Sequence, residues 1–187
     1  MDGSAVGRCL DLLDSQRREV LRRLDGIAEK HLWWRPEPDA WSIGENLDHA
    51  RLAGRTFRRF LKGLWPLLKL TAWPVRRRPY PTKIDDVYER PGFPLSVGWV
   101  WSPRYTPARP APLATLATNL EAEHNRMRAF YAGKDEHLLG YAWLWDPAMG
   151  AVNMIQALRV VAYHDAHHYR TVEERLRALD VAQEQRI

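Results

Sequence analysis

The sequence has very little cysteine, since Cys9 is the only one among 187 residues. A single thiol excludes a disulfide within the chain and a metal site built from several cysteines, and it is typical of a reducing compartment. Any bound metal must therefore be held by histidines and carboxylates. We expect a cytoplasmic protein.

Long apolar runs are also missing. The most apolar stretch, residues 64–75, is too short to span a bilayer and contains Pro66 and Lys69. The first residues lack the basic and apolar regions of a signal peptide. Apolar residues make up 45% and charged residues 27% of the chain, as in soluble folded proteins. At this length we expect one domain over residues 1–187.

Signals for β-strands are scarce, whereas apolar residues recur at helical spacing in four regions. They predict helices over about residues 10–30, from Ser42 to Pro66, over 113–132, and from about 155 to 179. Ser42 is followed three residues later by Glu45, which is the capping box that marks a helix start. Pro66 is expected to end the second helix.

The segment 64–111 interrupts this pattern, because ten of the 13 prolines lie between Pro66 and Pro112. So many prolines predict a long irregular insert, with a short strand pair around residues 95–101. The other two connections are short enough for antiparallel neighbours, while the insert lets the third helix run parallel to the second. We therefore predict an all-α, four-helix bundle of up-down-down-up topology.

Histidines gather on the last helix, where His164 and His168 are four residues apart. That spacing places both imidazoles on one helix face, about 6 Å apart along the axis, where they could hold one divalent metal. Two partly buried histidines that bond to their neighbours would give the same pattern. The pair alone therefore leaves both interpretations open.

A third histidine, His49, lies seven residues after Ser42 on the second helix. In the predicted topology the second and fourth helices are antiparallel, and the axial positions of His49, His164 and His168 agree within the error of the helix ends. Three imidazoles without a fourth protein ligand would leave an open position. Such a site is typical of catalytic zinc or a similar metal.

The stretches WRPEPDAWSIGENLDHA and HDAHHYR contain these residues, and together they resemble the DinB/YfiT-like superfamily. The resemblance covers residues 10–180. It implies a four-helix bundle of up-down-down-up topology and a metal bound by His49, His164 and His168. The insert looks longer and richer in tryptophan and proline than is expected of the family.

The resemblance also implies a range of activities. Its members include metal-dependent transferases that use low-molecular-weight thiols such as mycothiol or bacillithiol, as well as metal-dependent hydrolases. We accordingly expect a small-molecule substrate, a divalent metal of the zinc, nickel or iron class, and a thiol supplied as a cofactor if the reaction needs one. The sequence does not indicate a catalytic acid or base.

Three further residues are candidates for orienting the metal-binding imidazoles: Glu45, Asp165 and His124. Each has a simpler alternative, namely a capping carboxylate for Glu45, a surface acid for Asp165 and a hydrogen-bonded core histidine for His124. Trp41 is expected to close the end of the bundle by packing.

Acidic residues are absent from His49 to Ile84, a stretch that holds ten lysines and arginines. A solvated helix face is the simple explanation. The alternative is a non-catalytic binding module that uses residues 51–83 to bind an anionic membrane surface or nucleic acid, although the sequence contains no nucleic-acid motif in support. A homodimer is a further alternative, because the insert carries much apolar surface.

Overall fold

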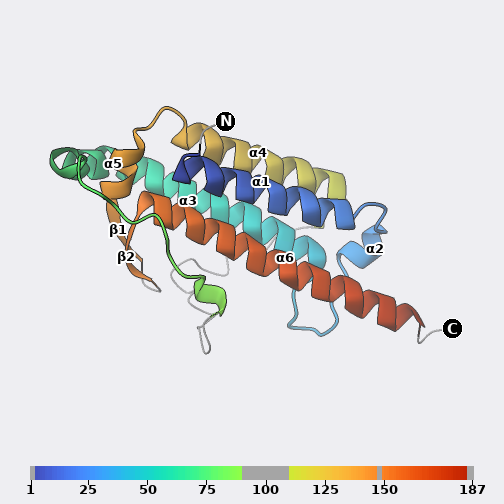
Figure 1. The fold of residues 1–187 in the computed structure, drawn as a ribbon. Coiled ribbons are helices and arrows are strands. Elements are labelled where there is room, and N and C mark those ends of the chain that lie inside the picture. The colour runs from blue at the N-terminus through green and yellow to red at the C-terminus, as the bar shows by residue number, and fades with distance from the viewer. Residues whose placement is uncertain (1–2, 90–109, 147–148, 185–187) are drawn as a thin grey trace.

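Four long helices form the body of the protein in a computed structural model that describes residues 3–89, 110–146 and 149–184. They are α1 (Ala5–Arg23), α3 (Ile43–Ala72), α4 (Leu113–Tyr131) and α6 (Met154–Glu184). Figure 1 shows that α1 and α6 run one way along the bundle while α3 and α4 run the other way. The predicted four-helix bundle of up-down-down-up topology is confirmed.

Side-chain contacts give the register of this arrangement. Arg17 pairs with Glu121 and Arg128 pairs with Asp11, which makes α1 and α4 antiparallel. Arg23 of α1 lies 3.5 Å from Glu173 of α6. Each long helix therefore has two long neighbours, and α1 lies diagonally opposite α3.

The first helix begins earlier and ends earlier than predicted. Ser4 caps it, since its hydroxyl accepts a hydrogen bond of 2.9 Å from the Gly7 N–H. The helix ends at Arg23, and Gly26 adopts a φ of +76° in the turn that follows. Residues 29–32, which the prediction placed at the end of the first helix, form a separate short helix, α2 (Glu29–Leu32).

Pro66 does not end the second long helix, which corrects the prediction. Helix α3 starts at the predicted capping box of Ser42 and Glu45 and continues to Ala72, with Pro66 inside it. A proline there removes one backbone hydrogen bond and costs about 3 kcal/mol. Its ring faces solvent, and buried Leu68 and Ala72 in the next turns join the core, which offsets that cost.

Shorter elements connect the long helices: η1 (Trp73–Val75), η2 (Val87–Glu89), α5 (Glu136–Tyr141), β1 (Trp143–Asp146) and β2 (Gly150–Asn153). The two strands pair antiparallel, with Trp143 opposite Asn153, and this hairpin was not predicted. The strand pair that we expected around residues 95–101 lies outside the described residues.

The start of α6 is capped from the hairpin. The side-chain oxygen of Asn153 accepts hydrogen bonds from the N–H groups of Ile155 and Gln156, and the Gln156 side chain accepts one from the Asn153 N–H. This reciprocal pair satisfies N–H groups that have no partner within the helix. It fixes where α6 begins and therefore where its histidines lie.

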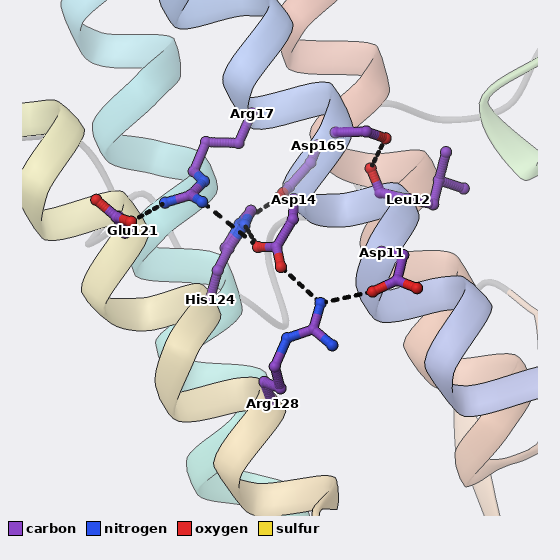
Figure 2. A network of polar contacts seen from close by, with 9 residues as sticks. Asp11, Leu12, Asp14, Arg17, Glu121, His124, Arg128 and Asp165 are labelled. Atoms are coloured by element: carbon purple, nitrogen blue, oxygen red, sulfur yellow. Dashed lines mark hydrogen bonds and ion pairs between the residues drawn. The ribbon is translucent and has the colours of Figure 1, made fainter. Parts of the chain in front are cut away.

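Two apolar clusters fill the bundle. The hairpin-end core contains Leu13, Leu61, Met127 and Leu158, and the cap-end core contains Val20, Leu47, Leu120 and Val172. Charged and polar side chains lie along the helices between the residues of the two clusters, and Figure 2 shows Asp14, Arg17, His124 and Asp165 among them. We call them the polar layer, defined as Asp14, Arg17, Arg58, Glu123, His124 and Asp165. Among the described residues, no helix is long and apolar enough to cross a membrane.

Candidate metal centre

The structure brings together the three predicted histidines on α3 and α6. Each of His49, His164 and His168 offers a ring nitrogen, and the three nitrogens lie within 4.8 Å of one another. The Nε2 atoms of His49 and His164 are 3.1 Å apart. All three residues are partly buried, and the cluster lies where α3 meets α6.

A hydrogen-bond chain from the cap of α3 sets the protonation of His168. The Asn46 amide donates a hydrogen bond of 2.8 Å to the Ser42 carbonyl, which orients its oxygen toward His168. That oxygen accepts a hydrogen bond of 2.9 Å from His168 Nδ1. Because Nδ1 carries the proton, Nε2 of a neutral ring keeps its lone pair for a metal.

Asp165 determines in the same way which ring nitrogen of His164 carries the proton. Its Oδ1 lies 3.3 Å from His164 Nδ1, and its Oδ2 lies 3.2 Å from Nε2 of His124. The carboxylate is 1% exposed. Burial by itself would raise the pKa of Asp165, but the hydrogen bonds from His124 and His164 outweigh burial and lower that pKa. Asp165 is therefore an acceptor, and His164 presents Nε2 to the cluster.

The donor set fits a divalent metal. Burial, followed by the neighbouring His164 and His49, lowers the pKa of His168 well below its ordinary value, so this ring is neutral at physiological pH as a ligand must be. The 3.1 Å between His49 Nε2 and His164 Nε2 is close to the ~3.3 Å expected for two nitrogens bound at ~2.0 Å to a tetrahedral ion. Within the described part of the chain, the cluster contains no carboxylate or thiol ligand. Three ligands would leave one position open.

Aromatic side chains form walls beside the cluster. Trp41 lies parallel to the His168 ring at 5.9 Å and tilted to His49 at 4.7 Å. Tyr88 in η2 stacks on His167 at 5.2 Å and meets the edge of His164 at 6.0 Å. Burial, and then the charge of Asp165, raises the pKa of Tyr88, so its phenol stays protonated.

Tyr88 is placed there by the extended segment 79–84, which we call the strap. Four strap carbonyls accept hydrogen bonds from side chains of α5, β2 and α6. The donors are Tyr141 to Pro79, Asn153 to Pro81, Gln156 to Lys83 and Tyr163 to Ile84. Residues 64–72 of the predicted insert thus belong to α3, whereas residues 79–84 are bound along α6 and lead directly to the metal centre.

The candidates for orienting the imidazoles have different outcomes. Asp165 and His124 lie where an orienting role requires, in a chain that ends on His164. Glu45 does not, because its carboxylate bonds to the Ser42 N–H and to the Arg35 guanidinium, which gives it the capping role. Trp41 corrects another expectation, since it faces the histidine cluster instead of only closing the bundle end.

Sequence reasoning missed Asn46 and Tyr88. Asn46 is three residues before His49 and so shares its helix face, which is a usable signal for a residue that supports a ligand. Tyr88 gave no comparable signal, because its position depends on the long-range hydrogen bonds of the strap.

The chain is similar to known proteins both in sequence pattern and in fold. The sequence pattern of the DinB superfamily matches residues 12–172. The fold is similar to that of YfiT from Bacillus subtilis, described as a probable metal-dependent hydrolase with an unusual four-helix bundle topology. The TM-score is 0.59 at 14% identity, and the match covers 96% of this chain and 90% of YfiT. No curated protein sequence matches the chain.

Proposed function

Because the chain belongs to the DinB superfamily, we propose that it is a metal-dependent enzyme that acts on a small molecule through His49, His164 and His168. The observation that carries this proposal is the pair of acceptors, Asn46 and Asp165, that turn Nε2 of His168 and of His164 toward one point. A hydrogen bond from the second ring nitrogen to a carboxylate or carbonyl oxygen is typical of histidines that ligate a metal.

A bound divalent ion at an open three-histidine site lowers the pKa of a water or thiol that occupies the fourth position. The side chains of the protein bind and orient the ion and restrict access to it. Trp41 and Tyr88 provide apolar walls beside the histidine cluster, which favours a substrate with an apolar part.

The reaction is either hydrolysis or transfer to a low-molecular-weight thiol. A thiol would have to come from a cofactor, because Cys9 is 2% exposed in the hairpin-end core and burial raises the pKa of its thiol. Hydrolysis needs only water. Turnover of a panel of electrophiles with and without added mycothiol or bacillithiol would separate the two reactions.

Metal content tests the proposal directly. We expect freshly purified protein to contain about one divalent ion per chain by elemental analysis, and the double variant His164→Ala/His168→Ala to contain none. An exposed pair on α4, Asn125→Ala/Arg126→Ala, serves as the control and should keep the metal. Metal-free wild-type protein that also fails to take up Zn²⁺, Ni²⁺ or Fe²⁺ would refute a metal-dependent function.

The end of α3 supports a second, compatible function. Leu67, Leu70 and Trp73 are 60%, 72% and 50% exposed there. Lys62, Lys69 and Arg78 are exposed beside them, and no ion pair with another described residue neutralises these cations. We propose that this surface within residues 51–83 contacts an anionic membrane, because leucines can insert among acyl chains but cannot stack on bases.

Co-sedimentation with vesicles tests this surface. Wild-type protein should sediment with mixed phosphatidylcholine and phosphatidylserine vesicles but not with phosphatidylcholine alone, and salt should weaken binding. Lys62→Ala/Lys69→Ala and Leu70→Ser should reduce it, while Arg22→Ala, on the exposed face of α1, should not. Unchanged sedimentation of these variants would count against membrane binding. If light scattering shows that wild-type protein is a dimer and Leu70→Ser a monomer, the surface is a homodimer interface instead.

A further inference from the structure

Helix α4 provides no ligand to the three-histidine cluster, yet one of its side chains is connected to it. His124 is 8% exposed and lies between α1 and α6 in the polar layer. Figure 2 shows its ring between the carboxylates of Asp165 and Asp14. On the Asp165 side, His124 Nε2 is 3.2 Å from Oδ2.

Asp165 depends on that contact. A carboxylate that is 1% exposed has lost its hydration, so each oxygen needs a donor from the protein. Oδ1 receives the hydrogen bond of His164, and Oδ2 receives that of His124. Without the second donor, Asp165 can turn toward another donor, and that change releases His164.

Asp14 does not compete for the same proton of His124. Its nearer oxygen is 3.7 Å from His124 Nδ1, which is outside hydrogen-bond distance. Arg128 holds Asp14 at 2.6 Å, and Arg17 lies 3.5 Å from it. The neighbouring charges of α1 and α4 are therefore paired with each other, and the Nε2–H of His124 remains directed at Asp165.

We propose that His124 is a positioning residue for the metal centre, which acts by holding Asp165 Oδ2 so that Asp165 Oδ1 orients His164. The proposal rests on the metal site proposed above. It makes α4, the helix without a ligand, a determinant of metal affinity. Loss of a comparable hydrogen bond behind a ligating histidine weakens metal binding about 10–100-fold.

Titration of the metal-free full-length chain with Co²⁺ tests the proposal, because visible absorption reports both affinity and ligand geometry. His124→Gln keeps an N–H that reaches Asp165, whereas the shorter His124→Asn does not. We expect Co²⁺ binding within about threefold of wild type for His124→Gln and about 10–100-fold weaker for His124→Asn, with an altered absorption band.

The matched control is Glu123→Gln, next to His124 on the same helix. Glu123 is 2% exposed and bonds to Arg58 and Arg126, so the variant disturbs the polar layer without contacting Asp165. It should leave Co²⁺ affinity unchanged. If it weakens binding as much as His124→Asn does, the effect is general loosening of the bundle, and the proposal is wrong.

A double-variant cycle provides the second measurement, and His124→Ala replaces His124→Asn in it if His124→Asn fails to fold. Asp165→Asn removes the group through which His124 acts, so adding His124→Gln or His124→Asn to it should cause no further loss of affinity. Additive losses would overturn the proposal, as would wild-type affinity and spectrum in His124→Asn. Wild-type protein that binds no Co²⁺ would instead refute the metal site itself.

Discussion

The two apolar cores and the polar layer between them are formed by the same four long helices but have different roles. The cores consist of aliphatic side chains such as Leu61 and Leu158, both fully buried, that stabilise the bundle without fixing any one atom. The polar layer and the histidine cluster beside it contain directional contacts, such as those of Asp165. A change in a core should therefore alter stability, and a change near the cluster should alter geometry.

The largest effect on stability should come from the hairpin-end core. Leu158 is fully buried on α6, less than two turns before His164, so Leu158→Ala should lower the unfolding free energy by about 2–5 kcal/mol. Urea denaturation would measure this, with Val181→Ala, 52% exposed on the same helix, as a control that changes stability by less than about 0.5 kcal/mol. Folded Leu158→Ala protein should still bind one metal. Loss of metal from folded protein would show that the core also determines the geometry of the metal centre.

A moderate effect of the opposite kind is expected at Asn46. Asn46→Ala removes the acceptor of His168 Nδ1–H, so metal affinity should fall about 10–100-fold while the unfolding free energy falls by about 1–3 kcal/mol. Chelator competition gives the affinity and urea denaturation the stability. Asn125→Ala, exposed on α4, should change neither. A large loss of stability with unchanged affinity would make Asn46 a purely structural residue.

The smallest effect should come from the charge of Glu45. Burial opposes its ionisation, but Arg35 and Ser42 outweigh burial and lower the pKa of Glu45. A lowered pKa in the folded state adds stability that is complete above the unfolded pKa of ~4.3 and is lost as pH falls through the folded value. The contribution should be below about 1 kcal/mol, because Arg35 is exposed.

Glu45→Gln isolates that charge, because glutamine keeps the capping box. The unfolding free energy of wild-type protein should therefore fall more steeply than that of the variant between about pH 5 and pH 3. Equal slopes would show that the charge adds nothing. Metal affinity at neutral pH should be the same in both proteins, since Glu45 contacts Ser42 and Arg35 instead of a histidine.

Features that depend on local spacing were predictable from the sequence. The i, i+4 pair of His164 and His168, the capping box at Ser42 and the end of α4 before Gly133 each depend on neighbours in the chain. The prediction that His49 lies close to His164 and His168 followed from the helix lengths and the topology. The bundle could be predicted because each helix carries its own apolar pattern.

Features that depend on tertiary contacts were not predictable. Pro66 was expected to end a helix, but buried Leu68 and Ala72 extend α3 past it. Short strands such as β1 and β2 have no distinctive apolar pattern. The cap that Asn153 provides to α6 comes at the end of β2, so it was not predicted either. The position of Tyr88 depends on carbonyl groups of the strap, which every residue type has.

The strap has a consequence for how such a protein can vary. Its contacts with α6 and the hairpin use backbone carbonyls of residues 79–84 and side chains of Asn153, Gln156 and Tyr163. Much of the information that fixes the strap is therefore encoded on the partner elements. Tyr80 is an exception within the strap, because its ring packs against the hairpin-end core and its hydroxyl bonds to Glu136. A related chain that keeps these three donors and Tyr80 could therefore differ elsewhere in the insert while residues 79–84 still reach the metal centre.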